Sequence, residues 1–413
     1  MYYLQIMDSP QNLYSLLLQD NFHLFDRKLR HFAEHISTNF NSVSLGVGHN
    51  FHKEYDNYFS LDGCDFDDHI ALISTIKNSP DKIVNSKINV TGKTIFFNHG
   101  EGTADADTFN SLHSLIRLSN IQGECYYANL AENLEELYME FCHKHNEPML
   151  LKCFTFESNP FAKRYHKSGI NGKYSVYQYF DVPGSNIIEE KKLYCCFNLK
   201  PRMHRAGIIS LLHYKNLLDQ GYVSSPHEFY EEREAYIKEK DWVQFVNHSE
   251  KQLSSLAEFN SIKECLTGLK ELYPLRVDSR TRFADTDEVL SSTHLYKCRI
   301  ESLFELITET IFTGSHFFTE KTYYPIFLGK PFLMVGSYGM LSSLRKQGYK
   351  TFEPYIDESY DLEKDDAVRL LKIVNEVERL AKLRKENPQE FYQNYNFILK
   401  ISNFNKNLFL DRG

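Results

Sequence analysis

The chain has 413 residues, of which 42% are hydrophobic and 25% are charged, and its formal net charge is −8. This length exceeds one ordinary compact core and predicts two domains, while the composition is typical of a soluble globular protein. The acidic balance argues against a broadly basic nucleic-acid-binding surface.

The eight cysteines contain no C-x-x-C pair, so we expect reduced thiols. The sequence begins without the basic and apolar stretches of a signal peptide, and we find no apolar run of about eighteen residues. We therefore predict a protein without a membrane span in the cytoplasm, or in the host cytoplasm if the chain is viral.

Two short apolar runs in the first half, at 43–47 and 93–98, predict buried strands. The second run ends in a glycine-flanked turn, NHGEG, before a predicted helix over 104–117. Glycines let a substrate approach the backbone closely, so an acid in such a turn can act as a general base. Glu101 is therefore a candidate base and His99 a second polar contact. The alternative is a turn that needs its glycines and leaves Glu101 solvated.

Another acid follows an apolar run in the segment 154–160, FTFESNP. Glu157 is the alternative base, and sequence spacing does not choose between it and Glu101. Cys142 and the neighbouring His143 and His145 are residue types that bind metals, but further ligands at the usual spacings are missing. We expect a solvated helix end there and no metal site.

The stretch 181–185, DVPGS, precedes a charged run and is the expected linker. It predicts an N-terminal α/β domain at 1–185 and a second α/β domain at 186–388. The second domain begins with a predicted strand at 193–198. A helix with apolar periodicity follows over 206–218.

Cationic side chains lie between that strand and that helix: Lys200, Arg202, His204 and Arg205. Helix N-terminal amides attract phosphate, and such side chains can bind a pyrophosphate and offset charge on a leaving diphosphate without a metal. Cations at a helix N-terminus also oppose the helix dipole, which disfavours a purely structural role. We therefore predict a phosphate site here.

The next predicted elements are helices within 228–270, anchored by Trp242 and Phe245, and a strand at 272–277. Asp278 at the end of that strand is expected to face a base or a ribose. Beyond 361, a long amphipathic helix is predicted over 362–385, and Pro388 should end it.

The segment 301–361 holds two apolar runs, at 303–307 and 331–335, which predict buried parallel strands. Glu309 follows the first strand, and Thr319, Glu320 and Lys321 open the helix after it. Ligands of doubly wound sheets bind at the carboxyl ends of the strands, so these side chains should converge. The alternative is that Glu320 is only a first-turn residue favoured by the helix dipole. A short helix over 340–347 should end at Gly348.

The string FELITET…FFTEKTYYPIFLGKPF resembles the nucleotide-sugar site of fucosyltransferase-like glycosyltransferases with the GT-B architecture. In that family an acid at a strand end is followed by a T-E-K that opens a helix. Glu309 matches the acid, and Thr319, Glu320 and Lys321 match the T-E-K. Asn198 and Arg202 match an Asn and an Arg that follow an earlier strand. The family's Glu-Asn pair is Glu309-Thr310 here, a departure that concerns which sugar is held.

The resemblance implies two Rossmann-like domains facing a central cleft, with a C-terminal helix within 389–413 that crosses back to the first domain. It implies inverting transfer of a sugar from a nucleotide sugar to a glycan hydroxyl, without a metal or another cofactor. Glu101 or Glu157 would deprotonate the acceptor, and Glu309 would bind sugar hydroxyls or balance positive charge. Donor binding would fall to Asn198, Lys200, Arg202, His204, Arg205, Thr319, Glu320 and Lys321. Two alternatives remain open: a viral glycosyltransferase acting on hydroxymethylated DNA bases, and a non-catalytic GT-B-like binding protein.

Overall fold

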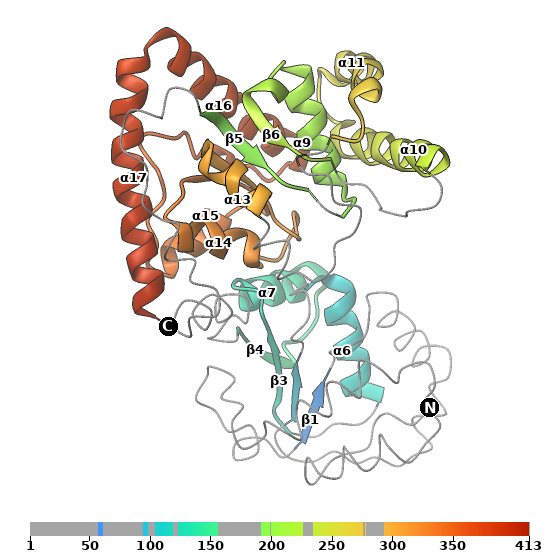
Figure 1. Ribbon diagram of the computed structural model, residues 1–413. Helices are drawn as coiled ribbons and strands as arrows, with labels where there is room; N and C mark the ends of the chain where they lie inside the picture. The colour runs from blue at the N-terminus through green and yellow to red at the C-terminus, as the bar shows by residue number, and fades with distance from the viewer. Residues whose placement is uncertain are drawn as a thin grey trace. The chain divides into compact units, whose positions relative to one another are not determined.

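A computed structural model describes residues 57–60, 94–97, 104–118, 123–155, 191–198, 200–225, 234–275, 277 and 293–412. The chain separates into two compact units. One comprises Met1–Pro160 and Gly314–Phe317, and the other Phe161–Thr313 and Phe318–Gly413. Each contains a four-stranded parallel sheet with helices, so the protein is a mixed α/β structure (Figure 1). The predicted boundary at 185 and the predicted strand at 43–47 lie outside the described residues.

The first unit has the strand order β1-β2-β3-β4, and every neighbouring pair is parallel. Its strands are β1 (Asn57–Ser60), β2 (Thr94–Phe97), β3 (Cys125–Asn129) and β4 (Leu151–Thr155). Helices α6 (Ala106–Leu118) and α7 (Leu134–His145) follow β2 and β3. Phe96, Phe109, Tyr127 and Tyr138 pack in the core between them. The predicted strand at 93–98 and helix at 104–117 are confirmed, and His143 and His145 lie in the last turn of α7.

The second unit has the order β6-β5-β7-β8, again all parallel. Its strands are β5 (Lys192–Cys196), β6 (Gly221–Val223), β7 (Ser302–Thr308) and β8 (Phe332–Val335). The chain adds β6 on one side of β5 and then β7 on the other side. The order therefore reverses between β5 and β7, and ligands of such sheets bind at the carboxyl ends beside this switch point.

Helices surround this second sheet (Figure 1). They are α9 (Met203–Tyr214), α10 (Glu234–Leu253), α11 (Phe259–Leu272), α13 (Thr293–Ile300), α14 (Glu320–Leu328), α15 (Met340–Lys346), α16 (Asp366–Glu386) and α17 (Pro388–Asp411), with short 3₁₀ turns η3 (Leu218–Gln220) and η4 (Ser359–Leu362). Helix α9 contacts α10, α11 and α16, and α14 contacts α17. The predicted anchors Trp242 and Phe245 are buried and contact Tyr273.

The predicted strand at 272–277 does not form over its described residues. Helix α11 continues to Leu272, and Pro274 has no N–H to donate to a sheet ladder. Leu275 instead exchanges bonds with Ser225, whose N–H donates to the Leu275 carbonyl at 3.0 Å and whose Oγ accepts from the Leu275 N–H at 2.9 Å. Asp278 lies outside the described residues.

The expected C-terminal helix is present as α17 and packs within the second unit. Its aromatic side chains explain this placement. The Tyr395 hydroxyl donates to the Leu303 carbonyl at 3.0 Å, and the Tyr395 ring meets Phe304 edge to face. Phe409 stacks on Tyr323 near the other end of the helix. Among the described helices none is long and apolar enough to cross a membrane.

Candidate functional site

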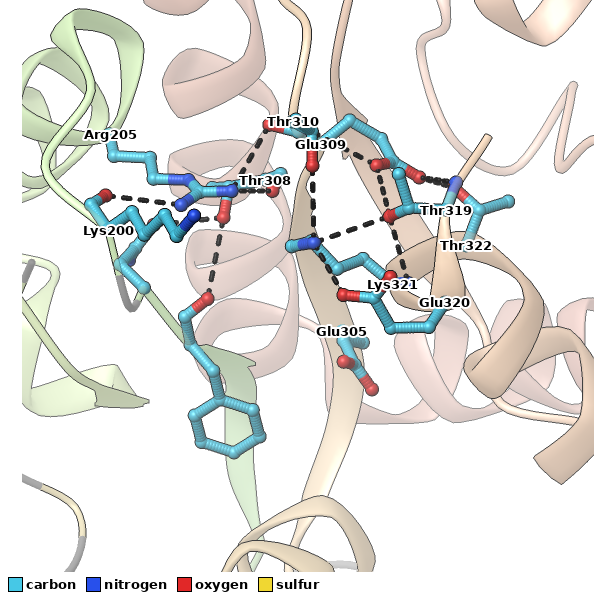
Figure 2. Close-up of polar contacts among 12 residues, drawn as sticks. Lys200, Arg205, Glu305, Thr308, Glu309, Thr310, Thr319, Glu320, Lys321 and Thr322 are labelled. Atoms are coloured by element: carbon cyan, nitrogen blue, oxygen red, sulfur yellow. Dashed lines mark hydrogen bonds and ion pairs between the residues drawn. The ribbon is translucent and has the colours of Figure 1, made fainter. Parts of the chain in front are cut away.

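Glu309 follows β7 at the switch point and is fully buried. One carboxylate oxygen accepts from the Thr319 N–H at 3.0 Å and the Thr322 hydroxyl at 2.5 Å. The other accepts from the Thr319 hydroxyl at 2.6 Å and the Thr310 N–H at 3.1 Å. Figure 2 shows the carboxylate enclosed by these threonines. In this structure Glu309 therefore fixes the β7–α14 connection and faces protein donors, whereas contact with sugar hydroxyls was expected.

Thr319, Glu320 and Lys321 form a closed polar group at the start of α14. Thr319 is the N-cap, and its hydroxyl oxygen accepts from the Lys321 N–H at 3.2 Å. The Lys321 ammonium donates to Glu320 at 2.6 Å and to Thr310 and Thr319 at 3.3 Å (Figure 2). Burial opposes the charge of Glu320, but the Lys321 ammonium outweighs it and holds the pKa of Glu320 below 4.5. The segment thus presents a partly buried ion pair beside Glu309.

Asn198 joins the carboxyl ends of three strands. Its Nδ2 donates to the Ser224 carbonyl beyond β6 at 2.9 Å. Its Oδ1 accepts from the Thr308 hydroxyl at the end of β7, also at 2.9 Å. This side chain is buried and sets the spacing of the edge at which the predicted ligand would bind.

Arg205 and His204 point from the first turn of α9 to the end of β7. The Arg205 guanidinium donates to the carbonyls of Lys200 at 3.1 Å, Thr308 at 3.3 Å and Glu309 at 3.4 Å. The His204 Nε2 bonds the Glu309 carbonyl at 2.9 Å. Burial and the nearby Arg205 lower the pKa of His204 well below 6.5, so this imidazole is neutral. Its predicted role as a phosphate-binding cation therefore does not fit, because a neutral ring already bonded to a carbonyl offers no charge.

Arg205 keeps its charge at neutral pH, although burial and the neighbouring Arg202 lower its pKa to about 10. Its Nε is buried and has no hydrogen-bond partner among the described residues. Arg202 lies three residues before Arg205 in the sequence. Arg202 is the N-cap of α9, and Lys200 is exposed just before it. The predicted donor residues therefore gather at one sheet edge, whereas Glu101, His99 and Glu157 lie outside the described residues.

Several polar residues of this edge were not predicted from the sequence. The hydroxyl of Thr308 bonds Asn198, that of Thr310 bonds Lys321, and that of Thr322 bonds Glu309. The repeated threonines around an acid at a strand end were the sequence pattern that could have indicated these contacts.

Two buried arginines were also not predicted from the sequence. Arg369 on α16 donates to the Phe312 carbonyl at 2.7 Å, and its guanidinium lies 4.2 Å from the Phe312 ring centre. An arginine within an amphipathic helix is common on exposed surfaces, so the sequence does not indicate that this one is buried. Arg299 forms a buried pair with Glu305 inside β7 at 3.0 Å. For that pair the signal was a charge within an apolar strand.

The described arrangement can hold an anionic group. Two arginines in the first turn of a helix beside a parallel sheet edge are suited to phosphate oxygens. Among the described residues no group of three or more His, Cys, Asp or Glu side chains could hold a metal ion.

No protein family matches the chain, and neither curated proteins nor solved structures give a significant match.

Proposed function

We propose that the protein is a glycosyltransferase that moves a sugar from a nucleotide-sugar donor to an acceptor hydroxyl. The supporting observation is the position of Arg205, which the carbonyls of Lys200, Thr308 and Glu309 hold at the β5–β7 switch point. In this proposal the two α/β units are the Rossmann-like domains of a GT-B enzyme of the cytoplasm. The acceptor is a glycan.

The donor diphosphate binds at the start of α9, where Arg202, Arg205 and Lys200 supply positive charge. As the acceptor oxygen bonds the anomeric carbon, the leaving diphosphate gains charge that these cations offset without a metal. The reaction is an inverting displacement. Glu320 and Lys321 contact donor hydroxyls, and Glu309 keeps α14 in position. The resemblance supplies Glu101 or Glu157 as the base.

Thermal unfolding against a panel of nucleotides and nucleotide sugars, with and without a chelator, tests donor binding. A ligand at about 100 times its Kd stabilises the native state by about 2.7 kcal/mol and raises the midpoint. We expect one nucleotide class to raise it with or without chelator, and Arg202→Gln to abolish the effect. Lys263→Gln is the control, because it removes an exposed cation paired with Glu250 on α10. A wild-type protein that responds to none of these ligands contradicts the proposal.

Release of nucleoside diphosphate separates an enzyme from a binding protein. The saturated hydrogen bonding of Glu309 is the observation that favours the second function, since that carboxylate has four protein donors in place of a substrate. With the responding donor and a glycan array, we expect diphosphate release above the protein-free rate. Donor binding without release would support a non-catalytic GT-B-like protein.

A further inference from the structure

An apolar surface lies at the carboxyl end of β8, within the second unit. Tyr338, in the turn that follows this strand, is 36% exposed, and Leu362 at the end of η4 is 75% exposed. The Gly339 N–H donates to the Asp361 carbonyl at 2.6 Å, which places the segments that hold these two side chains side by side. Among the described residues no other large apolar side chain is as exposed as Leu362. Exposed apolar side chains at the ligand-binding edge of a sheet are suited to contact a ligand.

Arg369 on α16 holds the two segments of this surface together. Its guanidinium donates to the Gly336 carbonyl, in the turn after β8, at 3.0 Å and to the Glu363 carbonyl at 2.8 Å. Glu363 directly follows Leu362 in the sequence. Because one buried arginine bonds both segments, the surface is preorganised and loses little conformational freedom when a ligand binds.

The same arginine connects this surface to the first turn of α9. Its guanidinium lies 4.2 Å from the centre of the Phe312 ring. The His204 ring stacks on Phe312, with 5.0 Å between the ring centres. His204 lies between Arg202 and Arg205 in the sequence, and all of these residues belong to the second unit. A series of side-chain contacts therefore leads from the cationic turn of α9 to the apolar surface.

The separation between the cationic turn and the apolar surface matches the length of a nucleotide. The order β5-β7-β8 places one strand between β5, which leads to the cationic turn, and β8. Neighbouring strands lie about 4.8 Å apart, so the ends of β5 and β8 are about 10 Å apart. This is close to the distance from the diphosphate to the base of an extended nucleoside diphosphate. On the far side of β5, the residues after β6 are already bonded to Asn198 and Leu275. A ligand with its phosphates at α9 can therefore extend over β7 to the surface at β8.

A lysine lies beside the apolar surface. The Lys364 Nζ is 5.4 Å from the centre of the Tyr338 ring. Among the described residues no acid pairs with this ammonium, whereas the nearby Lys372 pairs with Glu363 at 2.7 Å. An ammonium donates hydrogen bonds and accepts none. It therefore favours a base with a carbonyl oxygen at its edge, such as guanine or uracil, over adenine and cytosine, which have amino groups there.

We propose that Tyr338, Leu362 and Lys364 form the subsite for the nucleobase of the donor, and that this base is guanine or uracil. The assignment rests on the proposed function, because the diphosphate at α9 fixes where the nucleoside begins. The base stacks on Tyr338, Leu362 contacts its apolar face, and Lys364 donates to its carbonyl oxygen. Every base can stack on an aromatic ring, so the lysine supplies the selection between bases.

Calorimetric titration of the full chain with inorganic pyrophosphate, ADP, CDP, GDP and UDP tests the subsite. We expect the wild type to bind GDP or UDP at least about tenfold more tightly than ADP, CDP and pyrophosphate. Tyr338→Ala should weaken binding of the preferred nucleotide by about 5–100-fold and change pyrophosphate binding by less than about twofold. Phe397→Ala is the matched control, because it removes an aromatic ring on α17 that is 40% exposed.

Two further variants separate stacking from base selection. Leu362→Asn keeps the test decisive if Tyr338→Ala does not fold, because so exposed a side chain contributes little to folding. We expect it to weaken the preferred nucleotide by about 2–10-fold and to leave pyrophosphate binding unchanged. Lys364→Gln should lower the preference for GDP or UDP over ADP and CDP by about tenfold. Lys263→Gln, which removes an exposed cation of α11, should not change this preference.

Each contrary result has its own meaning. A wild-type protein that binds pyrophosphate as tightly as the nucleoside diphosphates overturns the base subsite and leaves the diphosphate site at α9 standing. Binding of ADP or CDP as tight as that of GDP and UDP also overturns it. Unchanged affinity of Tyr338→Ala and Leu362→Asn for the preferred nucleotide overturns it as well. If neither pyrophosphate nor any nucleotide binds the wild type, the proposed function fails, and the base subsite fails with it.

Discussion

Glu309 and Glu132 show how environment separates two glutamates at equivalent places in two parallel sheets. Each follows a strand at the carboxyl edge. Glu309 is fully buried and accepts four bonds from protein donors. Glu132 is partly buried and has no carboxylate partner among the described residues. The first environment stabilises structure, and the second leaves a group that can exchange a proton.

The raised pKa of Glu132 predicts a pH-dependent gain in stability on substitution. Because the folded state prefers the protonated form, the contribution of Glu132 to stability is full below pH 4.5 and is lost as pH rises to about 7. Glu132→Gln removes the costly charge. We expect it to raise the free energy of unfolding by at most about 3 kcal/mol near pH 8 and by much less near pH 5. Denaturant titrations at both pH values check this, and an equal effect at both would contradict it.

Glu309→Gln tests the structural role of that carboxylate. The NH₂ group of a glutamine side chain would face the N–H and O–H donors of Thr310, Thr319 and Thr322. Some of these buried donors would then have no acceptor. We expect the free energy of unfolding to fall by about 2–4 kcal/mol, against about 1 kcal/mol for Thr322→Val, which removes one donor. Urea denaturation of the three proteins measures both values. Unchanged stability of Glu309→Gln would show that the carboxylate is not needed for folding and would return it to a substrate-binding role.

At the scale of elements, hydrophobic periodicity and helix caps predicted most of the second sheet. The runs at 193–198, 303–307 and 331–335 are β5, β7 and β8, and the T-E-K opens α14 with Thr319 as its cap. The sequence did not reveal where α17 packs, because an aromatic helix face fits any apolar surface. The neutral state of His204 could not be predicted from the sequence either, because it depends on burial beside Arg205.

The loop over Gly314–Phe317 depends on one side chain of the first unit. Asn133 makes two of its bonds, so Asn133→Ala should free this loop at a cost of about 1–2 kcal/mol. Hydrogen exchange at the His316 amide should accelerate, because Asn133 supplies its acceptor. Asn396→Ala, an exposed position on α17, is the control. Unchanged exchange at His316 would mean that its bond to Asn133 does not limit opening of the loop.

At the scale of the whole molecule, the chain passes between its two units at 160–161, 313–314 and 317–318. The bond from the Ala104 N–H to the Ser315 hydroxyl spans 211 residues of sequence. The completed first unit therefore includes a segment made long after its sheet, and contacts of such separation form slowly. No local pattern in 314–317 indicates this pairing, since the loop bonds remote backbone and polar atoms without apolar periodicity. Local apolar runs predicted β2, β5, β7 and β8, but they did not predict this exchange of a segment.

The net charge of −8 predicts which macromolecular acceptor the protein avoids. A protein acting on hydroxymethylated DNA bases would neutralise several phosphates, and its affinity would fall steeply as salt rises. We expect no binding of a duplex carrying such bases at about 0.15 M salt, because the net negative charge of the protein repels DNA. Fluorescence anisotropy of a labelled duplex from about 0.05 to 0.3 M salt measures this. Tight, salt-sensitive binding that depends on Lys200 and Arg202 would make DNA the acceptor in place of a glycan, because those side chains would then be binding the duplex.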